Sequence, residues 1–431
     1  MRARKDPGAI LGLVLLLSAV PVHSAAGAEE LSPAAEDRGA ARFDPEEATR
    51  AYLARQSPEE KARSDAYFEG GYWLRLWGFL YGLGVAWLLL GTGLSRRMRE
   101  LAERASRRPT LQSAAYSAQY IAAGFVLGFP LSVYAGFVRE HRYDLSNQSF
   151  GAWLGDEVKG LAVGLVLGSL AIAGLYAVLR KAPRSWWIWG TVVALAFLCF
   201  AFLITPVFIN PLFNTYTRLE DATVREPILS LARANGVPAT DVWVFDASKQ
   251  TKRVSANVAG FAGTERISLN DNLLARCTLP EIEAVMGHEM GHYVLNHMYE
   301  LVLELGVVLA LGFAFLSWGF ERVRRRLGGA WGVRGLSDPA GLPLLAALLS
   351  VFFFFATPVT NSLIRVNEAE ADLYGLNAAG QPDGFAEVAL KLGEYRKLDP
   401  GPIEEFVFYD HPSGRQRIAM AMRWKAEHLG E

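Results

Sequence analysis

The chain has 431 residues, of which 51% are hydrophobic and 20% are charged, and its formal net charge at pH 7 is −1. A composition this apolar excludes an intrinsically disordered chain. The balanced charge excludes a protein that binds nucleic acid through a strongly basic surface. Two cysteines are too few for a disulfide scaffold or for a zinc site made of thiolates. The fold class therefore depends on how the apolar residues are distributed along the sequence.

The first 28 residues have the pattern of a secretory signal peptide. The N-terminal end is basic, residues 9–22 are an uncharged Leu-rich run, and residues 26–28 are small enough for a cleavage site. This run is shorter than the roughly 20 apolar residues that span a bilayer, so a cleaved signal is favoured over a short uncleaved anchor. Residues 29–71 are polar and contain two Pro-Glu-Glu helix starts, which predict an N-terminal helical extension.

Six later segments are long and apolar enough to cross a bilayer. Four of them lie within residues 72–209 and two within residues 301–359. Their approximate bounds are residues 72–94, 114–138, 160–179, 186–209, 301–320 and 341–359. Tryptophans at several of their ends suit the two interfaces of a membrane. We therefore expect an all-α polytopic membrane protein that contacts the lipid bilayer.

The loops between these spans differ in charge. The loops after the first, third and fifth spans are rich in arginine, whereas acids balance the bases in the short loop after the second span. The positive-inside rule places the arginine-rich loops in the cytoplasm. Residues 210–300 and 360–431 then face the extracytoplasmic side and together suffice for one modest domain. With the signal peptide, this arrangement suggests a protein of the bacterial inner membrane.

The strongest signal for chemistry is the segment 288–292, which reads His-Glu-Met-Gly-His within a helical pattern. Residues four apart on a helix point in one direction, so His288 and His292 can approach one metal ion. This geometry is typical of two zinc ligands, with Glu289 beside an open coordination position as general base. The alternative, two ordinary histidines on a helix surface, is disfavoured because the chain has only seven histidines.

A third ligand must come from elsewhere in the chain. The longer zincin pattern fails, because other residues occupy its later glycine and histidine positions, and His297 is one residue out of register. We interpret His297 as a residue behind the ligands or on the surface. After the sixth span, Glu368 and Asp372 share one helical face, so that one carboxylate can bind zinc while the other orients a histidine. Helix geometry leaves Glu370 pointing elsewhere as a solvated acid.

These motifs resemble the integral-membrane zinc metallopeptidases called type I CAAX prenyl endopeptidases, together with their bacterial relatives. The similarity extends beyond the zinc motif and keeps the same order from about residue 43 to about residue 425. The segments that carry it are residues 52–56, 209–214, 255–258, 287–297, 368–372 and 411–417. The resemblance implies a helical barrel that encloses a water-filled chamber, with a small α+β catalytic domain of zincin type.

The resemblance also implies roles for individual residues. One zinc ion would be held by His288, His292 and Glu368, with Glu289 as the general base. Asp372 would lie behind the ligands and orient a histidine. The catalytic domain would combine two parts, residues 210–300 and 360–431, on either side of the last two spans.

Three segments of the first part have the composition of short strands, the last two joined by a turn at residues 262–263. They are residues 241–245, 253–258 and 265–269. An edge strand there could hold an extended peptide across the zinc. By resemblance, Asn257 and Arg417 bind the substrate, and His411 stabilises the oxyanion of the tetrahedral intermediate.

The sequence thus predicts a membrane-embedded zinc metalloendopeptidase that acts on membrane-associated or unfolded polypeptides, with CAAX-type processing left open. The alternative is a non-catalytic scaffold or chaperone that keeps zinc for structure. Glu289 argues against it, because structural zinc sites are closed by four ligands and need no base. A metal transporter would place its ligands within the spans. No nucleic-acid partner is expected, and the sequence does not define the oligomeric state.

Overall fold

A computed structural model describes residues 43–259 and 265–429. The predicted signal peptide at residues 1–28 and the predicted turn at residues 262–263 lie outside the described residues. Residues Pro45–Glu431 form one compact unit, and this unit contains every element discussed below.

Six helical segments of the described residues are long and apolar enough to cross a membrane, as predicted. They are α3 (Pro58–Gly91), α5 with η1 and α6 (Pro109–Arg142), α7 (Phe150–Lys181), α8 with η2 and α9 (Trp186–Phe213), α13 (His297–Trp331), and η4 with α14 (Pro339–Ala379). Their subdivisions are α5 (Pro109–Ser132), η1 (Val133–Val138), α6 (Arg139–Arg142), α8 (Trp186–Ile204), η2 (Thr205–Ile209), α9 (Asn210–Phe213), η4 (Pro339–Gly341) and α14 (Leu342–Ala379). The boundary expected at residue 71 falls inside α3, which is continuous from a capping box at Ser57 and Glu60.

The spanning helices carry apolar side chains on surfaces that no other part of the described chain covers. In the most apolar stretches of α5 and α8, none of the residues is buried inside the protein. Trp77, Trp189 and Phe355 are among the large side chains that are more than half exposed. Contiguous apolar surface of this size is unfavourable in water and is favourable against lipid. The packing therefore agrees with a membrane location.

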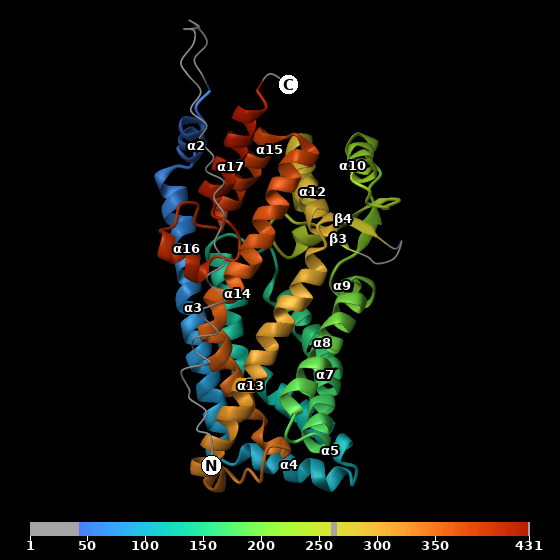
Figure 1. The fold of residues 1–431 in the computed structure, drawn as a ribbon, viewed down its shortest axis with the longest axis vertical. Helices are drawn as coiled ribbons and strands as arrows, with labels where there is room; N and C mark the ends of the chain where they lie inside the picture. Colours follow the sequence, from blue (N-terminus) through green and yellow to red (C-terminus); the bar gives the residue numbers. More distant parts are fainter. Residues whose placement is uncertain (1–42, 260–264, 430–431) are drawn as a thin grey trace, which may run out of the picture. The chain divides into compact units, whose positions relative to one another are not determined.

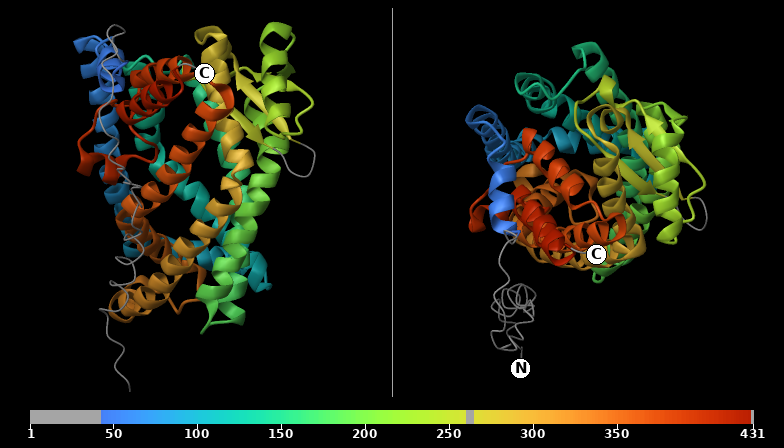
Figure 2. Two further views of the ribbon diagram at one scale, coloured as in Figure 1. Left: turned by 45° about the horizontal axis from the view of Figure 1, so that its top comes forward. Right: turned by 90° about the horizontal axis from the view of Figure 1, so that it is seen from above.

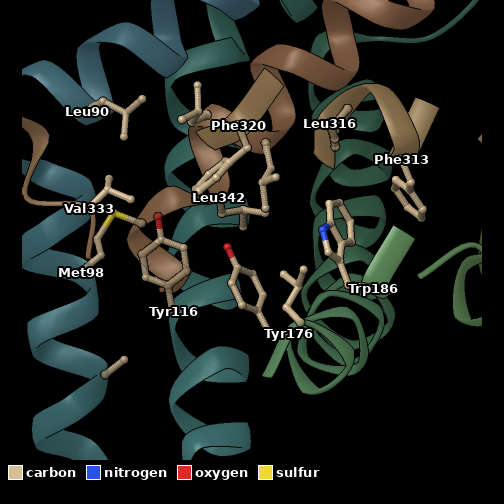
Figure 3. Packing of buried hydrophobic residues seen from close by; sticks show 14 residues of the cluster. Leu90, Met98, Tyr116, Tyr176, Trp186, Phe313, Leu316, Phe320, Val333 and Leu342 are labelled. Carbon is tan, nitrogen blue, oxygen red and sulfur yellow. The ribbon is translucent and has the colours of Figure 1, made fainter. Parts of the chain in front are cut away.

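A hydrophobic core joins the helices at the end that carries the arginine-rich connections, where α4 (Leu94–Ala105) lies in Figure 1. Figure 3 shows its buried aromatic side chains, among them Tyr116, Tyr176 and Trp186. Arg99 of α4 and Asp338 form an ion pair of 2.7 Å in the same region, and both side chains are buried. Packing and a buried ion pair thus close this end of the helix bundle.

A four-stranded sheet belongs to the opposite, catalytic end, in the order β1-β2-β4-β3. Its strands are β1 (Tyr216–Arg218), β2 (Val242–Phe245), β3 (Ala256–Ala259) and β4 (Arg266–Asn270). β2 and β4 are parallel, and β3 is an antiparallel edge strand beside β4. The three predicted strands are present. β1 was not predicted, because three residues are too few to show an alternating pattern.

Three helices cover this sheet through a second hydrophobic core, in which Ile228, Ile267, Leu273 and Met286 are fully buried. These helices are α10 (Ala222–Ala234), α11 (Asp271–Arg276) and α12 (Leu279–Val294). The remaining elements are α2 (Pro45–Leu53), η3 (Ala247–Lys249), α15 (Pro382–Lys391), η5 (Leu392–Glu394), α16 (Pro402–Phe408) and α17 (Gly414–Glu427). The expected combination of membrane helices with a small α+β domain is confirmed.

Candidate metal centre

Helices α12 and α14 lie side by side at the catalytic end (Figure 2) and approach each other at glycines. A Cβ atom added to Gly375 would lie 2.7 Å from the backbone nitrogen of His288. One added to Gly287 would lie 2.8 Å from the carbonyl oxygen of Gly375. Only residues without a side chain permit this distance. The close approach brings the histidine motif of α12 against the carboxylates of α14.

Three side chains direct ligand atoms toward one point between these helices. The Nε2 atoms of His288 and His292 are 3.1 Å apart. The nearest oxygens of Glu368 are 3.4 Å and 3.5 Å from these two nitrogens. Oε2 of Glu368 is buried and has no hydrogen-bond partner among the described residues. Two imidazoles and one carboxylate, each with a free lone pair, are thus close enough together to bind one metal ion. Three protein ligands of these kinds suit a zinc ion whose fourth position is open to water.

Asp372 fixes the orientation of the first histidine. Its Oδ1 is 2.8 Å from Nδ1 of His288, and the side chain is fully buried. A hydrogen on Nδ1 that is donated to Asp372 leaves the Nε2 lone pair free for a metal. Arg417, itself buried, donates to the same oxygen of Asp372 and compensates its charge. Arg417 thus has a partner within the protein in addition to a place in the wall of the cavity described below.

The carboxylates around the ligand set favour a positive charge there. Burial opposes protonation of His288, but the neighbouring carboxylates of Asp372 and Glu368 prevail and raise its pKa to about 10. Burial and the neighbouring His288 lower the pKa of His292 to about 4. A metal ligand must be deprotonated, so a divalent cation would replace this proton. The donor set is therefore electrostatically suited to a cation.

His297 lies directly behind the second histidine, where it is buried. Its Nδ1 is 2.9 Å from Nδ1 of His292, and its Nε2 is 3.4 Å from Oε2 of Glu370. A neutral His292 that offers Nε2 to a metal carries its hydrogen on Nδ1 and donates it to His297. The neutral His297 then carries its own hydrogen on Nε2, facing Glu370. His297 therefore orients His292 and cannot at the same time bind a second cation with Glu300 and Glu370, although those three groups are close together.

The sequence interpretation of these two residues needs one correction. His297 is indeed behind the ligands, but Glu370 is not merely a solvated acid. Its side chain is 56% exposed, yet it faces the histidine that supports His292. The distortion of the chain between α12 and α13 explains this arrangement, because Asn296 has a φ of 63° and begins a new helix at His297. Helical spacing counted from His288 fails beyond that point.

Glu289 and His411 line a common cavity of about 240 Å³, here called the catalytic cavity. Burial raises the pKa of Glu289 to about 7, at which a carboxyl group can both accept and return a proton. Nε2 of His411 lies 3.2 Å from Oε2 of Glu368, and its Nδ1 lies 2.8 Å from Asp410. The loop before α17 thus brings His411 beside the three metal-binding candidates.

The edge strand β3 runs next to α12, and Ser255 and Ala256 line the catalytic cavity. Asn257 is half-buried on this strand and pairs with Ser268 of β4. The other edge of β3 has no strand partner among the described residues. The structure thus places an open strand edge beside the site, as the sequence analysis expected.

Two family models match most of the chain. Residues 45–215 match the model described as the CAAX prenyl protease N-terminal domain with five membrane helices, and residues 218–425 match the model of peptidase family M48. The chain belongs to peptidase family M48. It is accordingly a membrane metallopeptidase, and four of its six candidate spans lie in the first matched region.

Individual relatives match this M48 peptidase over different shares of its length. The metalloprotease YhfN of Bacillus subtilis, whose role is uncharacterised, is 28% identical over 349 residues, 80% of this chain and 82% of the relative. CAAX prenyl protease 1 of Saccharomyces cerevisiae is 33% identical over 180 residues, 41% of this chain and 40% of the relative. The crystal structure of S. mikatae Ste24p matches with a TM-score of 0.71 at 22% identity, covering 88% of this chain and 94% of that one. The expected family and helical-barrel fold are confirmed.

Proposed function

We propose that this M48 peptidase is a zinc metalloendopeptidase in which His288, His292 and Glu368 hold the metal. The observation that carries the proposal is the convergence of two Nε2 atoms and one carboxylate beside a cavity that contains Glu289. Zinc bound by these groups would supply Lewis-acid chemistry that activates water and polarises the scissile carbonyl. The donors are the set that catalytic zinc sites use.

Three side chains around the proposed metal position would transfer protons or form hydrogen bonds during the reaction. Glu289 takes a proton from the attacking water and delivers it to the leaving nitrogen. A pKa of about 7 supports both directions of transfer. As an imidazolium, His411 would donate one hydrogen bond from Nε2 to the oxyanion and another from Nδ1 to Asp410. Asp372 accepts the hydrogen on Nδ1 of His288 and so directs Nε2 toward the metal position.

The open edge of β3 is proposed to hold the substrate as an added strand. Ala256 of this strand and the preceding Ser255 already line the catalytic cavity, so a peptide paired with the strand would cross the ligand set. Asn257, on the same strand, would add a side-chain hydrogen bond to the peptide backbone. Arg417 supports this binding through the cavity wall and through its ion pair with Asp372.

Membrane-associated or unfolded polypeptides are the proposed substrates, and a prenylated CAAX peptide is the second candidate because several relatives carry that activity in their names. The arginine-rich connections lie at the end of the bundle opposite the site (Figure 1). We therefore place the catalytic end on the extracytoplasmic side of a bacterial inner membrane. A reporter inserted within residues 214–240 that is active only in the cytoplasm would overturn this orientation.

The decisive experiment compares wild-type protein with Glu289→Gln on an unmodified peptide and on a farnesylated CAAX peptide. We expect Glu289→Gln to retain about one zinc per chain, measured by elemental analysis, and to lose peptide cleavage. Glu283→Gln is the matched control on the same helix, because Glu283 contacts Gln381 away from the ligands. Wild-type cleavage rates in Glu289→Gln would refute the mechanism. Zinc retention without hydrolysis by the wild-type protein would favour the non-catalytic scaffold.

A further inference from the structure

A second pocket adjoins the catalytic cavity and shares part of its wall. Its volume is about 510 Å³, and it lies between α3 and the chain segments around residues 395–397 and 408–414. Both pockets share Val254, Ser255, Tyr395, Arg396 and His411 in their walls. A ligand in the catalytic cavity can therefore continue into this second pocket, here called the cationic pocket.

The charges in its wall are mostly of one sign. The charged side chains that line it are Arg75, Arg139, Arg253, Arg396, Lys397 and Asp410. Five of these six groups are basic. In a space with protein walls, an excess of one sign raises the local concentration of the opposite charge. The cationic pocket is therefore suited to an anionic group.

Three of the five basic groups are already paired with acids of the protein. Arg253 donates to Glu140 at 2.7 Å, and Arg139 lies 3.9 Å from the same carboxylate. Lys397 pairs with Glu69 at 2.7 Å and with Glu404 at 3.0 Å. These acids neutralise much of the charge of their partners. An added anion would therefore be bound by the other two arginines, Arg75 and Arg396.

Arg75 and Arg396 form no ion pair within 4.0 Å in the part of the chain that the structure describes, although the charge of Arg396 helps to lower the pKa of Asp410 in the same wall. Arg396 is half-buried and lines both pockets, so its guanidinium lies at their junction. Arg75 is exposed on α3 and lines the cationic pocket but not the catalytic cavity. A guanidinium that faces a pocket without a carboxylate partner is a ready site for a carboxylate, which it can bind through two parallel hydrogen bonds.

The path of the chain explains why the anion would belong to the peptide. Val254 and Ser255, which lead into β3, line both pockets. A peptide added to this strand rises about 3.3 Å per residue, so residues next to the scissile bond must enter the cationic pocket. Stacked Tyr72 and Phe408, whose ring centroids are 3.8 Å apart, give the pocket an aromatic wall for apolar parts of the same residues.

We propose that the cationic pocket is a substrate subsite in which Arg396, assisted by Arg75, binds a carboxylate of the peptide a few residues from the scissile bond. This inference rests on the proposed peptidase function and adds a preference for acidic substrates. The carboxylate can be an Asp or Glu side chain or the C-terminus of the peptide. A lipid phosphate is the competing occupant, because Arg75 lies on a membrane-spanning helix.

The test uses quenched-fluorescent peptides of alternating Ala and Leu, in which one position at a time is Asp or its neutral counterpart Asn. A second pair of peptides differs only in a free or an amidated C-terminus. For wild-type protein we expect kcat/KM to be about tenfold higher for the carboxylate form at one position or at the C-terminus. A preference for Asp over Asn would identify a side-chain carboxylate, and a preference for the free C-terminus would identify the C-terminal carboxylate.

The variants Arg396→Gln and Arg75→Gln should each reduce that preference, with the larger loss in Arg396→Gln. Arg233→Gln is the matched control, because Arg233 is exposed on α10 and lines neither pocket. Zinc content must equal that of the wild type in each variant. Arg396→Glu should shift the preference toward a peptide with Lys at the same position, which a folding defect cannot produce.

Three outcomes would overturn the proposal. Wild-type protein that cleaves both members of every pair equally has no carboxylate subsite, although its peptidase function stands. A preference that survives in both arginine variants belongs to another site. In vesicles of phosphatidylcholine with and without phosphatidylglycerol, variants altered only in their response to phosphatidylglycerol would assign the pocket to a lipid phosphate. Failure of wild-type protein to cleave any peptide would instead refute the proposed function.

Discussion

The two ends of the membrane bundle are held together by different forces. The end with the arginine-rich connections has an aromatic core and the buried pair Arg99–Asp338, and it holds no candidate metal site among the described residues. The catalytic end concentrates imidazoles, carboxylates and cavities between α12 and α14. Several of its buried polar atoms, such as Oε2 of Glu368, have no partner among the described residues.

We infer that the arginine-rich end mainly stabilises the bundle, whereas the catalytic end mainly carries out its function. Buried groups left without partners cost free energy, and they persist where a ligand or substrate completes them. We therefore expect changes at the arginine-rich end to affect mainly the stability of the bundle. Changes at the catalytic end should affect mainly metal binding and peptide hydrolysis. Four substitutions test whether the two ends differ in this way.

The largest effect is expected from Glu368→Ala. Loss of the third ligand should reduce zinc binding and lower kcat/KM for peptide cleavage by about a thousandfold or more. Removal of metal from the wild-type protein by a chelator should give the same loss, and added zinc should reverse it. Elemental analysis and peptide hydrolysis measure both. Full activity of the chelated protein would remove the metal from the mechanism.

Arg99→Ala tests the opposite end. The substitution leaves the carboxylate of Asp338 buried without its partner, which costs about 3–5 kcal/mol of the free energy of unfolding. We expect a lower midpoint of thermal unfolding in detergent, with zinc content and kcat unchanged in protein that remains folded. Arg97→Ala, an exposed neighbour on α4, is the control. Equal stabilities of the two variants would contradict a structural role for the buried pair.

Gly375→Ala tests the contact between α12 and α14. The new methyl group would meet backbone atoms of His288, so the helices must separate, at a cost of about 1–3 kcal/mol. Zinc affinity should fall because His288 moves away from Glu368. Gly155→Ala provides a comparison at a helical position where a Cβ meets no atom within 4 Å. Unchanged zinc affinity in Gly375→Ala would show that the two helices tolerate separation.

His297→Ala is expected to have the smallest effect, about a tenfold loss of zinc affinity. The variant removes the group that accepts a hydrogen bond from Nδ1 of His292, and it replaces none of the three proposed zinc ligands. Glu370→Gln should be milder, because the amide oxygen can still accept from His297. His428→Ala, at the end of α17, serves as the control histidine. Zinc affinity measured by competition with a chelating dye distinguishes the three.

The sequence was most informative where one helix carries the whole pattern. His288 and His292 share a face by spacing alone, and so do Glu368 and Asp372, which is why the candidate site could be assembled from two short segments. The six spans followed from apolar length, and the positions of β2, β3 and β4 from short runs of strand-forming residues. These features depend on local order in the chain.

Contacts between distant segments were not predictable in the same way. Two such contacts join helices that are far apart in the sequence: Gly287 approaches Gly375, and Arg417 pairs with Asp372. The presence of a glycine or an arginine in a sequence does not indicate which distant residue it will contact. The position of Arg396 between two pockets depends likewise on the course of the chain around η5. Tertiary packing determines such positions, and local propensity carries no information about them.

Helix α14 is continuous from its membrane-spanning stretch to Glu368, the proposed metal ligand. Glu368 follows the apolar run that ends near residue 359, and a helix rises 1.5 Å per residue, so Glu368 stands at most about 13 Å from the hydrocarbon layer. An extended peptide covers that distance with about four residues. In a substrate anchored in the bilayer, a bond about four residues from the anchor can therefore reach the proposed zinc site without leaving the membrane.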